Sequence, residues 1–449
     1  MMEAEYLTTG IALHYSTPSL HAASITNNQP ENEIYSIPNY ELKKDVINRN
    51  YGADQDGWVK IINDLGMQFK FVAYKDIEVL KLQEDNYKIF VMPFSMAISE
   101  EEAAAIREFV KNGGVVISDG AGGIMNDHCS WQEKGMLDDL FGISAPISRE
   151  RELKGITGKV EVTKEGEAYK LDAKKLKGLE ALEPNIKAEQ AKSLISIDGE
   201  SAVFANKYGK GYAFQLNILL DQYPNLRENN YGGETHRYLL SKILSYVNIR
   251  PDIKVFTSDS NQLERALISR YKMGNSKLIA IVKEYTGEKA LMSKDGVTPD
   301  EIIKYEENLE VQNINIMLPE KYYVYDVRKG KEMGFTDKIK TSITDGDAVV
   351  IGLSPEKNTI NISGPGEISP GVQPEFIVSS ELERPQVIRC HLFGPEGEYI
   401  PAYSQNIILK KGKGKVIFPL TLSDIEGEYK IEISDVITGA SEETSFRIK

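Results

Sequence analysis

The chain has 449 residues, too many for one ordinary core, and a prior of about 100 to 200 residues per domain predicts two to four domains. A composition of 41% hydrophobic and 27% charged residues excludes extended disorder and indicates a chain that folds into globular domains. The formal net charge is −14 and the basic residues are scattered, so nucleic-acid binding is not expected.

The apolar runs, the N-terminus and the cysteines set further bounds. Runs such as Ile89–Met92 are far shorter than the roughly 20 residues that span a bilayer, so no transmembrane segment and no membrane partner are expected. The opening "MMEAEYLTTG" lacks the basic and apolar regions of a secretory signal, but a strand is predicted so soon afterwards that we expect Met1 to be an internal start. The compartment is therefore left open. Cys129 and Cys390 fall in different predicted domains, so no disulfide framework is expected.

Short apolar strands alternate with amphipathic helices from the start of the chain to about Tyr246. Ile11–Tyr15 is predicted to be the first strand. A helix then begins at Asp56, carries apolar residues at helical spacing and ends at Gly66, and Phe69–Val72 is the next strand.

The alternation continues with the strand Ile89–Met92. Ser99 and Glu102 form a capping box at the start of a helix that ends at Asn112–Gly114, and the strand Val115–Ser118 follows. This spacing predicts a parallel sheet with right-handed crossovers, in which ligands collect at the carboxyl ends of the strands. The predicted strand ends are Tyr15–Ser16, Pro93–Phe94 and Asp119–Gly120.

Beyond Pro251 the helical period largely disappears, and Pro-Gly, Glu-Gly and Gly-Asn turns punctuate short strands. The predicted domains are an α/β domain over residues 1–250, a β-sandwich over residues 251–355 and an immunoglobulin-like or macroglobulin-like β-sandwich over residues 356–449. The fold class is thus multidomain α/β plus all-β.

Four stretches in the first predicted domain occur in the order "IALHYSTPSLHAA", "FVMPFSMAISEEEAAAIREFVKNGGVVISDGAGGIMNDHC", "GMLDDLFGI" and "ANKYGKGYAFQLN". They resemble the middle domain of bacterial glycoside hydrolase family 42 β-galactosidases, which is called the β-galactosidase trimerisation domain. The resemblance covers roughly residues 11 to 250. It implies the flavodoxin-like fold of class I glutamine amidotransferases, a role in trimer assembly in carbohydrate metabolism, and a position after a catalytic (β/α)8 barrel.

The chain departs from that family in two ways. Nothing before Ile11 supplies eight β/α units, and no pair of carboxyl groups can be nominated for the separation of about 5 to 5.5 Å that a retaining glycosidase needs. We therefore expect the hydrolytic machinery to be absent from this chain. The tail beyond Lys357 resembles a macroglobulin-like or immunoglobulin-like extension, which favours a large multidomain carbohydrate-acting relative.

A candidate pocket is predicted at the strand ends, and no residue in it is assigned a catalytic role. Glutamine amidotransferases hold their cysteine on a tight strand-to-helix elbow, usually within G-x-C-x-G. Cys129 instead follows Asp119 by ten residues and has bulky neighbours, which favours a pocket wall over a nucleophile. The candidate pocket residues are Tyr15, Ser16, Asp119, Gly120, His128, Cys129 and Trp131.

Other ligand chemistries receive less support from the sequence. The run Gly120–Gly123 lacks the G-x-G-x-x-G spacing of a dinucleotide site, so no cofactor is expected. The histidines show no H-x-H or H-x-x-x-H spacing, so a metal site would need His14 or His21 to meet Asp119 and His128 in the fold, and no metal is expected.

Aromatic side chains near the strand ends are candidates for a sugar platform, because their faces stack on pyranose rings. Trp58, which lies at helical spacing, is expected in the core instead. The candidate platform residues are Tyr15, Trp131, Tyr208, Tyr212 and Tyr223.

Three functions are open at this point. The leading one is a noncatalytic accessory and oligomerisation region of a β-galactosidase-like glycoside hydrolase, whose partners are further copies of the chain, a trimer by the resemblance, or a covalently linked catalytic barrel. The second is a hydrolase or amidotransferase-like enzyme that uses the crevice near Asp119, His128 and Cys129. The third is a stand-alone glycan-binding protein.

Overall fold

The computed structural model of the chain describes residues 4–27, 51–120, 122–145, 147, 155–218, 220–227, 232–285, 298, 304, 309 and 311–449. The chain divides into two compact units. We call Thr8–Pro251 the α/β unit, and Met1–Leu7 together with Asp252–Lys449 the β unit. Across these described ranges, no helix is long and apolar enough to cross a membrane.

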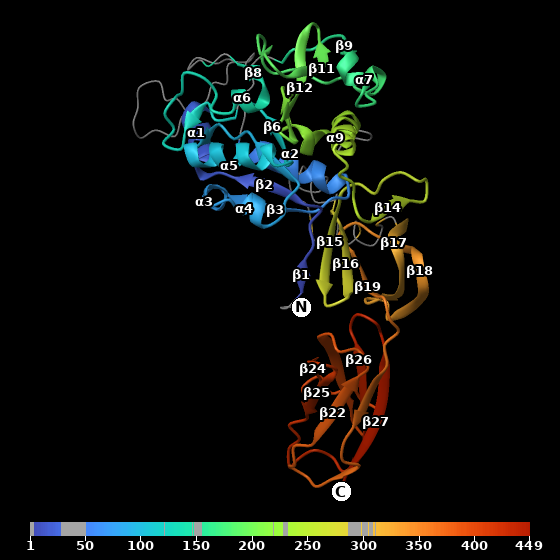
Figure 1. Ribbon diagram of the computed structural model, residues 1–449. Helices are drawn as coiled ribbons and strands as arrows, with labels where there is room; N and C mark the ends of the chain where they lie inside the picture. The colour runs from blue at the N-terminus through green and yellow to red at the C-terminus, as the bar shows by residue number, and fades with distance from the viewer. Residues whose placement is uncertain are drawn as a thin grey trace. The chain divides into compact units, whose positions relative to one another are not determined.

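An eight-stranded sheet forms the centre of the α/β unit in its described part, with the strand order β3-β2-β4-β6-β13-β12-β11-β9 (Figure 1). Neighbours among the first five strands pair in parallel, and the remaining pairs are antiparallel. The parallel sheet predicted from the alternation of strands and helices is thus confirmed. The strands are β2 (Ile11–Tyr15), β3 (Phe69–Ala73), β4 (Ile89–Pro93), β6 (Val115–Asp119), β9 (Val160–Val162), β11 (Lys192–Ile197), β12 (Glu200–Tyr208) and β13 (Gly211–Leu216).

Helices pack on both faces of this sheet. Trp58 and Ile243 lie in one core with Val91 of β4, whereas the next residue back along β4, Phe90, lies in a second core with Ile106. This split follows from the alternation of side chains along a strand that is buried on both faces. The longer helices are α1 (Thr17–Asn27), α2 (Tyr51–Asp64), α5 (Glu100–Lys111) and α9 (Glu234–Tyr246). The short helices are α3 (Tyr74–Glu78), α4 (Lys81–Glu84), α6 (Asp138–Phe141), α7 (Lys164–Glu167) and α8 (Tyr223–Leu226).

Two predicted helix starts had different outcomes. The helix predicted to begin at Asp56 begins at Tyr51, whose buried side chain packs in a cluster with Met96. This tertiary packing adds an early turn that no local signal indicates. The capping box of α5 is confirmed, because Ser99 Oγ accepts from the Glu102 N–H at 3.1 Å and Glu102 Oε2 accepts from the Ser99 N–H at 2.8 Å.

A buried ion pair connects α2 to the residue that follows α8. Arg227 donates from Nε and Nη2 to the two carboxylate oxygens of Asp64, at 2.7 and 2.6 Å. The Tyr223 hydroxyl also donates to Asp64, at 2.6 Å, and accepts from Arg237 of α9 at 3.1 Å. The Asp64 side chain is fully buried, so these bonds replace the water that the carboxylate loses on folding.

In the described residues, one seven-stranded sheet forms the first part of the β unit, in the order β1-β15-β16-β19-β17-β14, with β18 paired to β17. The pairing of β17 with β18 shifts between Met317 and Tyr322, where Pro319 cannot donate a ladder hydrogen bond. The part of β17 before this shift pairs with β14, and the part after it pairs with β19. Buried side chains from these strands form a single core. The strands are β1 (Glu5–Tyr6), β14 (Lys254–Thr257), β15 (Ala266–Met273), β16 (Ser276–Lys283), β17 (Gln312–Asp326), β18 (Lys331–Ile343) and β19 (Ala348–Ser354).

Two more sheets form the last part of the β unit. One has the order β20-β22-β25 and the other β21-β27-β26-β23-β24. Phe376 and Val416 of the first sheet share a core with Ile388 and Ile431 of the second, which is the arrangement of a β-sandwich. The strands are β20 (Ile360–Ser363), β21 (Glu367–Ile368), β22 (Glu375–Ser380), β23 (Gln386–Phe393), β24 (Gln405–Leu409), β25 (Lys413–Ile417), β26 (Gly427–Asp435) and β27 (Ser441–Ile448).

The buried ion pair yields the first testable prediction. Arg227→Ala should destabilise the α/β unit by about 3 to 5 kcal/mol, because it leaves the Asp64 charge buried without its main partner. Both tryptophans, Trp58 and Trp131, lie in this unit, so tryptophan fluorescence during urea unfolding of the whole chain reports on it alone. The matched control Lys159→Ala breaks an exposed pair and should leave the transition unchanged. An equal, small shift in both variants would contradict the assigned role.

Candidate functional site

The candidate site lies where β2, β4 and β6 end. These strands are parallel neighbours, so their last residues, Tyr15, Pro93 and Asp119, reach the same edge of the sheet. The expectation that the strand ends gather at one edge is therefore met by the pairing. What the edge can do depends on which side chains are exposed there.

Asp119 is fully buried and has a partner inside the protein. Its Oδ1 accepts a hydrogen bond from the Phe94 N–H at 2.7 Å, across the ends of β6 and β4. Phe94 has φ 34°, in the left-handed region that a bulky residue adopts only when its surroundings hold it there. The carboxylate thus fixes the turn that follows β4.

Ser16 is also buried, and Tyr51 covers it. The Tyr51 hydroxyl accepts from the Ser16 N–H at 2.8 Å, while Ser16 Oγ bonds to Ser19 Oγ at 3.0 Å. Burial, opposed by the bond to Ser16 and assisted by the nearby charges of Tyr15, Glu102 and Asp119, raises the pKa of Tyr51 to about 12. The phenol therefore stays protonated at neutral pH and does not serve as a base. Sequence reasoning missed Tyr51, since a tyrosine at a helix start carries no distinguishing signal.

A second hydrogen-bonded group at this edge was also missed. His14 Nδ1 lies 2.9 Å from Ser95 Oγ, and His14 Nε2 lies 3.0 Å from Glu102 Oε1. Serine, histidine and carboxylate in this order match the arrangement of a hydrolase triad. However, all three residues are at most 1% exposed, so a substrate cannot reach Ser95 in this conformation. The group holds β2, the turn after β4 and α5 together.

Tyr15 and His128 point to solvent rather than into a shared pocket. Tyr15 is 50% exposed and meets the equally exposed Phe71 edge to face, with ring centroids 6.2 Å apart. The His128 side chain is 82% exposed, and its Nδ1 lies 2.9 Å from Asp127 Oδ1. His21 is exposed as well. Within the described ranges, no group of three or more His, Cys, Asp and Glu side chains is placed to hold a metal ion.

Cys129 does not occupy the elbow after β6. That position is held by Gly120, which has φ 117°, while Ala121 lies outside the described residues. Cys129 lies on the loop after β7 (Met125–Asn126), where its Sγ is 3.6 Å from the Pro18 carbonyl oxygen. Burial, followed by the charge of Asp127, raises the pKa of its thiol, the opposite of what an activated nucleophile needs.

Trp131 lines a different feature, an open groove of about 880 Å³ beside α5. Arg107 crosses this groove to Asp139, with Nε donating to Oδ2 at 2.9 Å. The structure thus brings Ser16 and Asp119 into one buried edge, and it packs Cys129 and Trp131 against one hydrophobic cluster that includes Tyr51 and Phe94. The lining residues of the groove are Glu100, Ala103, Arg107, Trp131, Gln132, Glu133, Lys134, Gly135, Met136 and Asp139.

The other aromatic candidates serve packing. Tyr223 is fully buried against Asp64 and is not available to a sugar. Tyr212 lies 5.6 Å from Tyr246, centroid to centroid, and Tyr208 packs against the core. Trp58 is 1% exposed, so its predicted core position is confirmed.

Part of this chain is similar to a known protein family. Residues 38–225 match the family model described as the β-galactosidase trimerisation domain. The comparison with curated proteins gives no match.

Two solved structures share the fold. The β-galactosidase from Bacillus circulans sp. alkalophilus has a TM-score of 0.50 and 12% identity over 78% of this chain and 42% of its own. The β-galactosidase from Rahnella sp. R3 has a TM-score of 0.50 and 16% identity over 77% of this chain and 41% of its own. The chain therefore spans less than half the length of these enzymes. Residues 38–225, less than half of the chain, are thus similar to the β-galactosidase trimerisation domain of glycoside hydrolase family 42, and the two solved structures show a shared fold.

Proposed function

We propose that this chain is a noncatalytic accessory and assembly region of a β-galactosidase-like glycoside hydrolase. The family match of residues 38–225 carries the proposal. The candidate edge supports it, because Ser16 and Asp119 are buried and satisfied by internal partners, and Gly120 stands where a nucleophile is needed. In such a protein the sugar chemistry belongs to a catalytic barrel elsewhere.

We infer a flavodoxin-like, amidotransferase-like arrangement for the α/β unit. Counted in chain order, its five parallel strands lie in the order 2-1-3-4-5, which is the flavodoxin-like order. We also infer that residues 251–355 and 356–449 are separate domains within the β unit. Support comes from their two cores, one drawn from Ile253 to Leu353 and the other from Ile360 to Ile448.

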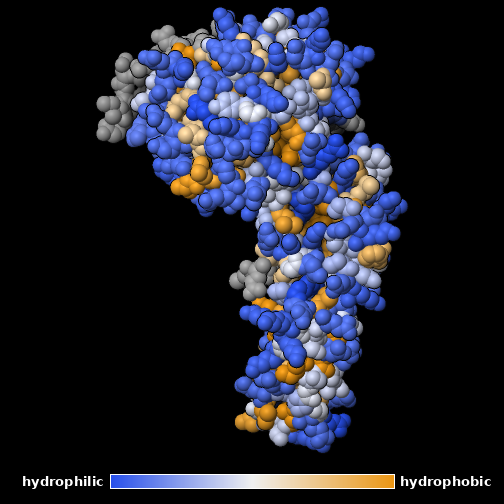
Figure 2. All heavy atoms as spheres, in the orientation of Figure 1, coloured by the Kyte–Doolittle hydropathy of each residue, from blue (hydrophilic) through white to orange (hydrophobic). Residues whose placement is uncertain are grey.

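The assembly surface that we propose is the free edge of the parallel sheet. β3 ends the strand order, and its Phe71 and the adjoining Tyr15 are about half exposed and in contact. Figure 2 shows mostly hydrophilic side chains on the face in view, with small and separate hydrophobic patches. Two touching, half-exposed aromatic rings at the free edge of a sheet are an apolar surface that a second copy of the chain would cover.

The oligomeric state tests this proposal. The full chain should form a homotrimer in size-exclusion chromatography with light scattering, and Phe71→Glu should convert it to monomer, because a buried charge at the contact is costly. The control Leu422→Glu changes an exposed apolar residue of the β unit, 82% exposed, and should leave the trimer intact. A chain that is monomeric at every concentration up to about 100 μM would reject the assembly role, since functional oligomers bind well below that level.

The reactivity of Cys129 provides a second prediction. Because the pKa of the thiol is raised, the thiolate fraction at pH 7 is lower than that of a free cysteine. Iodoacetamide should label Cys129 more slowly than it labels glutathione at pH 7, and the rate for Cys129 should keep increasing with pH beyond the point at which the glutathione rate levels off. A Cys390→Ser background confines the labelling to Cys129. Fast labelling already at pH 6 would instead indicate an activated nucleophile.

The groove at Trp131 favours glycan binding as a second function. One indole face beside polar side chains such as Arg107, Gln132 and Glu133 is the composition of a carbohydrate site, where the ring stacks on the sugar and polar groups bond its hydroxyls. The groove is open, so it suits a chain or a terminal sugar rather than an enclosed ligand.

A glycan array probed with the full chain tests this second function. Trp131→Ala should reduce any specific signal at least about tenfold, because stacking on the indole supplies a large part of the contact. Trp131→Phe keeps an aromatic face and should retain most of the signal. If both variants bind as strongly as the unchanged chain, the glycan lies elsewhere.

A further inference from the structure

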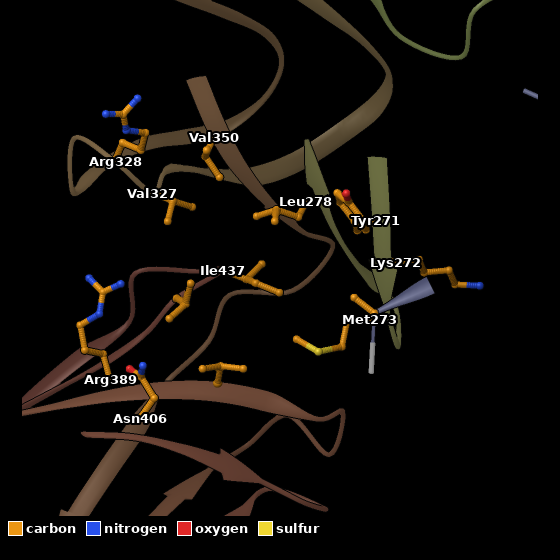
Figure 3. A pocket seen from close by; sticks show the side chains of 13 residues that line it. Tyr271, Lys272, Met273, Leu278, Val327, Arg328, Val350, Arg389, Asn406 and Ile437 are labelled. Carbon is orange, nitrogen blue, oxygen red and sulfur yellow. The ribbon is translucent and has the colours of Figure 1, made fainter. Parts of the chain in front are cut away.

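The β unit contains a cavity of about 370 Å³ that none of the functions above uses. It lies between strands of the seven-stranded sheet and strands β23 and β24 of the sandwich (Figure 3). Its size is within the range of small-molecule sites, which is about 300 to 1,000 Å³. The lining residues are Ala4, Tyr271, Lys272, Met273, Leu278, Val327, Arg328, Val350, Val387, Arg389, Asn406, Val436 and Ile437.

Close packing defines the walls of this cavity. A Cβ atom on Gly352 of β19 would lie 1.9 Å from the Ile437 carbonyl oxygen, and one on Gly439 would lie 2.2 Å from the Tyr325 ring. Only glycine therefore lets the turn after β26 lie so near β17 and β19. The Val436 N–H also donates to the Val387 carbonyl at 3.0 Å, which fixes the floor of the cavity. The cavity is preorganised rather than a loose gap.

The charged residues that line the cavity are all basic. Its lining includes two arginines and a lysine but no aspartate or glutamate, in a chain whose net charge is −14. Arg328 is already engaged, because its Nη1 donates to Asp347 Oδ1 and to the Ala348 carbonyl oxygen. Lys272 directs its ammonium group away from the apolar side chains in Figure 3.

Arg389 differs from these two cations. Its guanidinium group makes no hydrogen bond or ion pair with the described residues, and in Figure 3 it extends from β23 toward the Val327 side of the cavity. Asn406 is its direct cross-strand partner on β24, so both side chains stand on the same face of the sheet. A guanidinium and a carboxamide side by side can donate several hydrogen bonds to one anionic group.

We propose that this cavity binds a small organic anion, with its carboxylate or sulfonate held by Arg389 and Asn406 and its apolar body against Leu278, Val350 and Ile437. The apolar walls favour an anion with an apolar body over a strongly hydrated ion such as free phosphate, which Arg389 and Asn406 would contact on one side only. The unopposed positive charge excludes a cation. This site lies in the β unit, so it is independent of the assembly role proposed for the α/β unit.

Fluorescence titration of the full chain tests the proposal with two matched probes. The anionic probe is 8-anilinonaphthalene-1-sulfonate, and the uncharged one is N-phenyl-1-naphthylamine. Arg389→Gln should weaken the anionic probe about tenfold or more and leave the uncharged probe unchanged, because only the charged group loses a charge-assisted hydrogen bond. Arg447→Gln, an exposed arginine on β27 of the same sheet, should affect neither probe.

Three outcomes would overturn the proposal. They are no saturable binding of the anionic probe by the folded chain, equal affinity in Arg389→Gln and the unchanged chain, or the same loss in Arg447→Gln. Arg389 is exposed, so its substitution is not expected to unfold the β unit, and an unchanged thermal transition confirms this in the same samples. A second variant, Val350→Trp, places an indole in the cavity and should weaken both probes.

Discussion

The α/β unit depends on one constraint, which is that polar groups buried at the carboxyl edge of its sheet must find partners within the protein. Asp119 meets it through the Phe94 N–H, and His14 meets it through Ser95 and Glu102. Each bond joins the end of one strand to a turn or helix from another part of the chain. Leaving any of these groups unpaired would cost about 1 to 3 kcal/mol, which is a large fraction of the stability of a domain.

The same constraint accounts for the burial of the polar side chains that the structure describes at this edge. Ser16, Ser95 and Asp119 are turned inward, and their hydrogen bonds hold the structure together. Gly120 takes the elbow and gives the chain its sharp turn after β6 without adding a reactive side chain. Cys129 and Trp131 pack against the same hydrophobic cluster, and Trp131 also lines the open groove beside α5. This pattern agrees with a trimerisation domain whose contribution is a surface.

The β unit uses close backbone contacts where the α/β unit uses buried polar groups. Gly352 and Gly439 allow a turn of the sandwich to touch strands of the seven-stranded sheet, and the space left beside that contact is the cavity of Arg389. Arg389 has no hydrogen-bond or ion-pair partner among the residues that the structure describes, and a charged ligand would supply one next to the apolar walls. A ligand bound in this cavity would contact both sheets. It would therefore stabilise the folded β unit.

Local signals in the sequence determined much of the secondary structure. Continuous apolar runs placed β4 and β6, and the pair Ser99 and Glu102 placed the start of α5. These features depend on residues a few positions apart, so their physical causes are present in the sequence itself. The motifs also carried the resemblance that the family match of residues 38–225 confirms.

Only the tertiary structure decided what is buried and what meets across long separations. His14 and Glu102 are 88 residues apart in the chain, and Tyr51 reaches Ser16 from a helix that begins earlier than local signals indicate. The strand β1 joins the β unit although it precedes the α/β unit. Such contacts arise from the packing of whole segments, whose free energy is summed over many side chains. No short pattern encodes that sum, and it is what turned a predicted pocket into a buried edge.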